Sequence, residues 1–122
     1  MLSAEDFEAL VVEAVASMPE HILGYLRNVA ITVETWPTPA HLARGRVGPG
    51  YTLFGLYEGI PLIHRDSGYN LVAPDRITIF QGPIEQVFRT PEAIREQVRK
   101  TVLHEIAHHF GFDEHEIRNL GY

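Results

Sequence analysis

The 122-residue sequence contains no cysteine, which excludes disulfide bonds and every zinc site built on thiolates. Methionine is scarce, because only Met1 and Met18 are present. Long apolar runs are also missing, and no segment approaches the roughly 20 apolar residues that a membrane helix needs. The remaining composition, 45% hydrophobic and 21% charged, is that of an ordinary globular chain. These features predict a single domain over residues 1–122 that makes no membrane contact.

Basic residues are few, since 10 Lys and Arg stand against 16 Asp and Glu and the formal charge is −6. No basic run stands out, so nucleic acid is not an expected partner. The first residues, Met1 to Asp6, lack the basic start and apolar core of a signal peptide. Together with the lack of cysteine, this start favours a cytoplasmic protein.

One short motif carries most of the chemical information: His104-Glu105-Ile106-Ala107-His108. On a helix, two histidines four residues apart lie one turn apart on the same face, at the spacing that a zinc ion needs. A glutamate directly after the first histidine is placed to take a proton from a metal-bound water. A solvated histidine pair near a helix C-terminus is the alternative, favoured by the helix dipole, but it leaves Glu105 without a role.

The sequence around the motif predicts a helix from Pro91 to Phe110. Thr90 suits the N-cap, Pro91 the first helical position, and Gly111 the left-handed residue that ends a helix. Between them, apolar residues recur at three- and four-residue steps: Ile94, Val98, Val102, Leu103, Ile106, Ala107 and Phe110. The expected metal face, which is Thr101, His104, Glu105 and His108, lies beside this stripe.

A catalytic zinc usually has three protein ligands, and the third is sought after Gly111. Glu114 lies three residues beyond the glycine and ranks first, His115 has the better nitrogen donor but needs a longer turn, and Asp113 ranks third. Asp113 has a competing role, because Asp113-x-x-Glu116 resembles a capping box for a short helix from Glu114 to Leu120. His109 lies about 100° around the helix from His108, so we expect it to be partly exposed or packed behind the ligands.

The rest of the chain predicts a helix at Ser3 to Ala16, a short helical segment at Glu20 to Arg27, and alternating strands. The strands are expected at Val29 to Trp36, Tyr51 to Tyr57, Ile60 to His64 (in a hairpin with the strand before it) and Arg76 to Gln81, with loops at Pro37 to Gly50 and Arg65 to Pro74. This order predicts an α+β fold with both main helices on one face of a small sheet. We expect Arg76 to Gln81 to be the exposed edge strand, able to pair with an extended peptide.

Three blocks of sequence resemble a known family, the small bacterial zincin-like metallopeptidases. They are L-F-G-L-Y-E-G-I-P-L from Leu53 to Leu62, P-D-R-I-T-I-F from Pro74 to Phe80, and H-E-I-A-H-H-F-G from His104 to Gly111. The resemblance implies a minimal zincin fold, in which the active-site helix and an N-terminal backing helix pack on a small, twisted, mixed sheet. It also implies an acidic third ligand three residues after the glycine, which is Glu114. Unlike metzincins, this chain has no histidine at that position and no later methionine for a Met-turn.

The sequence therefore predicts a zinc-dependent metallopeptidase acting on a peptide or protein substrate. His104, His108 and Glu114 are expected to bind Zn²⁺, and Glu105 to act as the general base. Candidates for stabilising the oxyanion are Tyr69, His109, His115, Arg118 and Tyr122.

Two alternatives remain open. The first is a zinc-binding protein-interaction domain without catalysis, because nothing after the helix supplies a second wall to a cleft. The second is a metal-dependent ribonuclease similar to the bacterial ribosomal-RNA maturation enzymes. Those enzymes have a histidine where Glu114 stands and lack the glutamate after the first histidine.

Overall fold

The computed structural model describes residues 1–48, 52–59 and 74–119. Its first helix, α1 (Ala4–Ala16), begins where the sequence predicts, with the Ser3 hydroxyl accepting a hydrogen bond from the Asp6 N–H at 3.1 Å. Phe7, Val11 and Ala14 are buried along one side. Three- and four-residue spacing of these side chains thus gives α1 a single inward face.

The long helix α5 (Pro91–Phe110) also has the predicted bounds. The Thr90 hydroxyl accepts from the Ala93 N–H at 3.1 Å, and Gly111 ends the helix at φ 77° and ψ 30°, in the left-handed region. Every residue of the predicted apolar stripe is buried except Phe110, which is 44% exposed. Helix α5 therefore carries its C-terminal turn, with the histidines, to the surface.

Three strands form a mixed sheet in the order β1-β3-β2: β1 (Val29–Glu34), β2 (Gly55–Glu58) and β3 (Asp75–Phe80). Strand β3 runs parallel to β1 and antiparallel to β2. The prediction that the strand at Arg76 to Gln81 is an exposed edge is therefore wrong, because β3 is central and has Ile77, Thr78, Ile79 and Phe80 all buried. Within the described residues, the edges of the sheet are β1 and β2.

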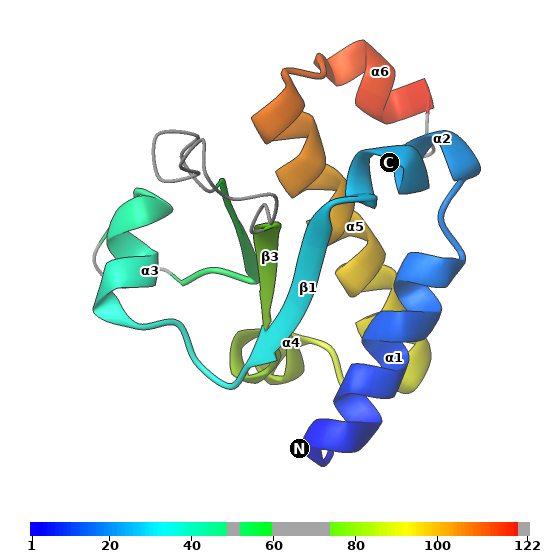
Figure 1. Cartoon of the computed structure of the whole chain (residues 1–122). Coiled ribbons are helices and arrows are strands. Elements are labelled where there is room, and N and C mark those ends of the chain that lie inside the picture. The colour runs from blue at the N-terminus through cyan, green and yellow to red at the C-terminus, as the bar shows by residue number, and fades with distance from the viewer. Residues whose placement is uncertain (49–51, 60–73, 120–122) are drawn as a thin grey trace, which may run out of the picture.

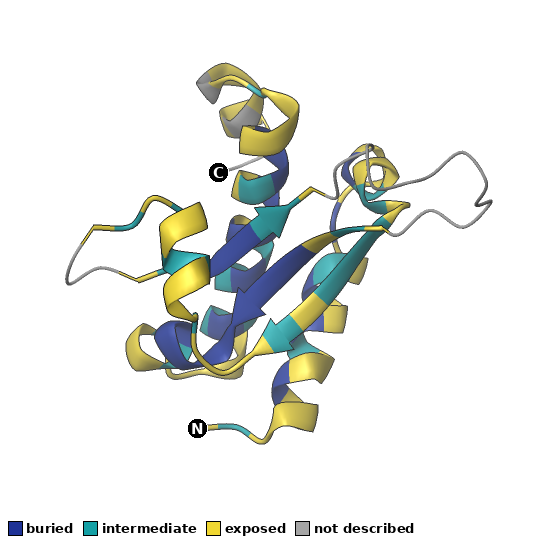
Figure 2. Cartoon of the chain, turned by 60° about the vertical axis from the view of Figure 1, so that its left-hand side comes forward, coloured by how far each residue is buried: buried dark blue, intermediate teal, exposed yellow. Residues whose placement is uncertain are grey.

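Helices α1 and α5 pack against each other on one side of the sheet, and α3 (Pro39–Arg44) lies on the other (Figure 1). The α+β class and the pairing of the two long helices are confirmed. The dark blue of the central strand in Figure 2 shows that most of β3 is buried. The largest fully buried side chains come from α1, α5, β3 and the helix that follows it, α4 (Gln81–Val87), together with Ile22 of α2 (Glu20–Leu23). They include Phe7, Ile77, Ile79, Phe80, Ile84, Ile94, Leu103 and Ile106.

The short helices match the sequence prediction less well. Helix α2 (Glu20–Leu23) and the 3₁₀ turn η1 (Gly24–Leu26) fill the predicted helical segment, and α6 (Glu114–Asn119) begins where predicted. The prediction of a loop from Pro37 to Gly50 is wrong in the middle of that range, because α3 forms there. Helix α4 (Gln81–Val87) was not predicted, and it begins directly where β3 ends. Strand β2 begins later than the predicted start at Tyr51, and the expected hairpin partner at Ile60 to His64 lies outside the described residues.

Helix α3 is held by a local cap and by charge. The Thr38 hydroxyl accepts from the His41 N–H at 3.1 Å, and His41 Nδ1 accepts from the Thr38 N–H at 3.0 Å. Arg44 pairs with Glu58 at the end of β2, and His41 Nε2 lies 3.6 Å from a Glu34 oxygen. These contacts fasten α3 to the face of the sheet that α1 and α5 leave open. No helix in the described ranges has the length and apolarity that crossing a membrane would require.

Candidate metal centre

His104 and His108 are both exposed on the last two turns of α5. Their ring centroids are 6.4 Å apart and their planes cross at 79°. Because residues four apart on a helix lie one above the other, both imidazoles occupy one side of α5 and meet solvent together. The H-E-x-x-H spacing predicts this placement. The buried apolar stripe of α5 faces the core, on another side of the helix.

Glu105 lies between the exposed histidines and the sheet, and it is half-buried. Its Oε1 atom accepts a hydrogen bond from the Tyr57 backbone N–H at 2.8 Å. Burial raises the pKa of the Glu105 carboxyl above its usual range, although this hydrogen bond and the nearby His108 and His104 act in the opposite direction. A raised pKa makes a carboxylate a better proton acceptor near neutral pH, which is what a general base requires.

The Tyr57 N–H belongs to the outer edge of β2. The Phe80 N–H donates to the Phe54 carbonyl at 2.9 Å, which fixes which residues of β2 face β3. In an antiparallel ladder, the main-chain N–H and C=O groups of successive residues point alternately toward and away from the neighbouring strand. The main-chain groups of Gly55 and Tyr57 therefore point away from β3. Glu105 therefore accepts from a main-chain donor on the side of β2 that faces away from β3.

Helix α5 meets β2 along a second stripe, in which Thr101, Glu105 and His109 follow one another at four-residue steps. Thr101 is buried, and a Cβ atom on Gly55 would lie only 2.5 Å from its Cγ2 methyl. At the other end the His109 ring stacks on the Tyr57 ring, with centroids 3.9 Å apart and planes 17° apart. Glycine at position 55 thus lets the strand approach closely enough for Tyr57 to reach Glu105.

Replacement of Gly55 by alanine should push β2 away from α5 and lower the free energy of unfolding by about 1–3 kcal/mol, a typical cost of overpacking. Urea denaturation measures this loss. The double variant Gly55→Ala with Thr101→Ser removes the opposing methyl and keeps the hydroxyl that Gln97 Nε2 contacts at 3.0 Å. It should recover a large part of the stability. Equal stability of Gly55→Ala and wild type would show that the close approach is unimportant.

The predicted third ligands lie on the turn after Gly111 and at the start of α6. The Asp113 Oδ1 atom accepts from the Glu116 N–H at 2.8 Å, and Glu116 Oε1 accepts from the Asp113 N–H at 3.4 Å, so the predicted capping box is confirmed. Asp113 is therefore committed to the helix cap. His115 is exposed, and Glu114 is the first residue of α6, but its side chain lies outside the described part of the structure.

In the described ranges, no three His, Asp or Glu side chains gather closely enough to hold a metal ion. The structure places His104, Glu105 and His108 on the last two turns of α5 without a third ligand among the described residues, and the proposed contribution of Glu114 stays a prediction. Of the candidates for the oxyanion, His109 is stacked on Tyr57, His115 and Arg118 are exposed on α6, and Tyr69 and Tyr122 lie outside the described residues.

Tyr57 is a candidate functional residue that sequence reasoning missed. Its contact with Glu105 uses the backbone N–H, which no motif based on side chains can reveal. The one available signal was its position inside the block from Leu53 to Leu62.

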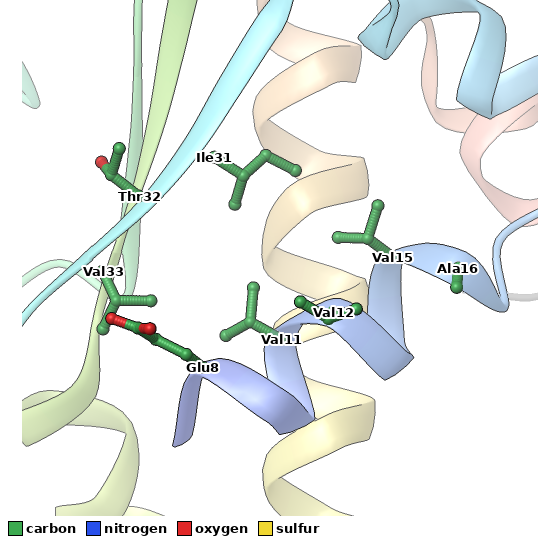
Figure 3. A pocket seen from close by; sticks show the side chains of 8 residues that line it. All are labelled: Glu8, Val11, Val12, Val15, Ala16, Ile31, Thr32 and Val33. Atoms are coloured by element: carbon green, nitrogen blue, oxygen red, sulfur yellow. The ribbon is translucent and has the colours of Figure 1, made fainter. Parts of the chain in front are cut away.

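An apolar hollow lies away from these residues. A groove of about 600 Å³ runs between α1 and the edge strand β1 (Figure 3). Its lining is Glu8, Val11, Val12, Val15, Ala16, Ile31, Thr32 and Val33. The exposed His104 and His108 are not among the residues that line this groove.

Comparison with known families decides the classification. A family model described as zincin-like metallopeptidase matches residues 26–122. This chain belongs to the zincin-like metallopeptidase family. The match includes the whole sheet and all of α5, whereas α1 precedes it.

Among solved structures, this zincin-like chain is similar to a conserved hypothetical protein from Thermo thermophilus, with 23% sequence identity and a TM-score of 0.55. The alignment covers 89% of this chain and 94% of the other, and it supports the shared fold. No curated protein matches the sequence.

Proposed function

We propose that this chain is a zinc-dependent metallopeptidase in which Glu105 is the general base. The observation that carries the proposal is the arrangement at the end of α5. Two exposed imidazoles, His104 and His108, flank a half-buried carboxylate whose Oε1 is held at 2.8 Å by the edge of the sheet. Membership of the zincin-like family supports the same reaction class.

The donor set fits zinc. His104 and His108 offer ring nitrogens from one exposed side of a helix, and neither ring forms an ion pair with a described residue that would have to be broken. Glu114 would complete the set, on the basis of its three-residue spacing from Gly111. When bound, zinc supplies a Lewis acid that acidifies water and polarises a carbonyl group.

Glu105 supplies the proton transfers. It takes a proton from the attacking water and gives it to the amide nitrogen of the departing peptide, so that the carboxylate is regenerated in each turnover. The raised pKa of Glu105 supports both steps, because a stronger base accepts the proton more readily and the half-buried acid can then donate it.

The outer edge of β2 supports a peptide as the substrate. The main-chain groups of Gly55 and the Tyr57 carbonyl point away from β3, beside Glu105. An extended peptide that pairs with this edge brings its backbone to the general base, and such pairing recognises main chain more than side chains. We therefore propose β2, rather than the strand first expected, as the strand that binds the substrate.

A zinc-binding interaction domain without catalysis is the second candidate. Tyr25 and Phe110 support it, because they are 39% and 44% exposed and their rings contact each other at 4.9 Å near the end of α5. Exposed aromatic side chains are typical of sites that bind other proteins. One zinc per chain without cleavage of a diverse peptide library would favour this candidate.

Replacement of Glu114 by alanine should reduce zinc affinity sharply, because a direct ligand is lost. Competition with a chromogenic chelator measures the affinity. Asp113→Ala and His115→Ala are the matched controls and should retain zinc. Asp113→Ala should cost about 1 kcal/mol of stability through the lost cap. If His115→Ala, and not Glu114→Ala, loses the metal, the assignment of the third ligand is wrong.

A further inference from the structure

Tyr57 makes three contacts that join three separate elements. Its hydroxyl donates to Asp75 Oδ2 at the start of β3 at 2.7 Å. Its ring stacks on His109 of α5, with centroids 3.9 Å apart and planes 17° apart. Its backbone N–H donates to Glu105 Oε1 at 2.8 Å. A single residue of the edge strand is thus fixed at its hydroxyl, at its ring face and at its main chain.

The ring of Tyr57 has little freedom between these contacts. Tyr57 pairs with Ile77, so Asp75 lies two residues further along the neighbouring strand, within reach of the hydroxyl. Burial, together with the Asp75 carboxylate, raises the pKa of the Tyr57 hydroxyl above its usual value. The hydroxyl therefore stays protonated and remains a donor to Asp75.

Stacking on Tyr57 gives His109, the second histidine of the His108-His109 pair, a structural role. His109 follows Glu105 by four residues, so both side chains face β2 from successive turns of α5. One turn holds the backbone of Tyr57 through the Glu105 carboxylate, and the next holds its ring through the imidazole. His109 therefore contacts β2, as Glu105 does. Its side chain does not lie on the face of α5 that carries His104 and His108.

We propose that Tyr57 is a positioning residue for Glu105, and that His109 and Asp75 hold Tyr57 in place. The Tyr57 N–H binds one carboxylate oxygen, Oε1, and leaves Oε2 to accept the proton of the attacking water. No hydrogen bond of Oε2 to another described residue is present. The consequence is a carboxylate with one defined orientation, which reduces the cost of aligning it in each turnover. This inference rests on the proposed peptidase function.

The test uses the purified full chain, reconstituted with zinc, and a fluorogenic peptide library. His109→Ala removes the stacked ring and should lower kcat about tenfold, the smaller end of the effect of losing a supporting partner, with KM and zinc content unchanged. His109→Phe restores a flat ring without nitrogen atoms and should recover most of kcat. Tyr57→Phe keeps the stack and loses only the bond to Asp75, so its kcat should fall between the two. His21→Ala, at an exposed histidine on α2, is the control.

Amide hydrogen exchange supplies a readout that does not depend on hydrolysis. In the metal-free protein, the Tyr57 amide should exchange several-fold faster in His109→Ala than in wild type, and His109→Phe should restore its protection. Wild-type kcat and protection in His109→Ala would overturn the proposal, as would a failure of His109→Phe to rescue either quantity. If wild type cleaves no peptide, the peptidase function fails, while the exchange rates still decide whether His109 positions Tyr57.

Discussion

Replacement of Glu105 by glutamine should abolish peptide hydrolysis and leave the fold and the metal site intact. Glutamine has nearly the same shape, and its amide oxygen can still accept the Tyr57 N–H bond. It cannot take a proton from water, so kcat should fall by about 10²- to 10⁴-fold. Hydrolysis of a fluorogenic peptide library, measured beside zinc content, gives the two quantities needed.

Stability separates this loss of activity from a loss of structure. Burial disfavours the charged form of Glu105 and raises its pKa, so a neutral glutamine should leave the metal-free protein at least as stable at neutral pH. Glu96→Gln is the matched control on the same helix, because among the described residues Glu96 pairs with Arg99 at 3.0 Å, away from Tyr57, and the variant should keep full activity. Unimpaired hydrolysis by Glu105→Gln would rule out Glu105 as the base.

Replacement of His104 or His108 by alanine should remove both zinc and activity. Each change deletes a direct ligand, so the affinity for zinc should fall by more than the roughly 10- to 100-fold that losing an outer partner costs. The metal-free fold should not suffer, because both side chains are exposed and alanine is the better helix former. Wild type should gain stability when zinc is added, and the variants should gain almost none.

A thermal unfolding series with increasing zinc measures this difference directly. His21→Ala again serves as the control, because it removes an exposed histidine from α2 and should retain the full response to zinc. If either variant at α5 is stabilised by zinc as strongly as wild type, that histidine is not a ligand.

The two long helices could be predicted closely because their boundaries depend on local chemistry. Ser3 and Thr90 accept hydrogen bonds from the first turns of α1 and α5, and Gly111 adopts the left-handed conformation that ends α5. Such caps act within four residues, so a single sequence contains all the information that they need.

The position of β3 in the sheet could not be predicted in the same way. Its order between β1 and β2 depends on pairings between residues far apart in the chain, such as the contact of Thr32 with Thr78 at 3.4 Å across 46 residues.

Helix α3 was missed for a different reason. It has six residues and no apolar periodicity, although Thr38 and Pro39 carry the start signal that could have identified it.

The residues of the candidate site also differ in whether local sequence is enough to predict them. His104, Glu105 and His108 follow from one helical spacing, and the structure places them as that spacing requires. Tyr57 follows only from the fold, because β2 must lie against α5 before its N–H meets Glu105. The role of Glu114 depends on a side chain outside the described part of the structure and remains a proposal.

The central claim, zinc-dependent peptide hydrolysis at the end of α5, is tested most directly by one reversible measurement on the unmodified protein. Cleavage of a diverse peptide library is followed for the zinc-loaded chain, then after the metal is removed with a chelator, and again after zinc is restored. We predict cleavage at first, none after chelation, and recovery with one zinc per chain. Cleavage that survives chelation, or a zinc-loaded chain that cleaves no peptide, would contradict the account.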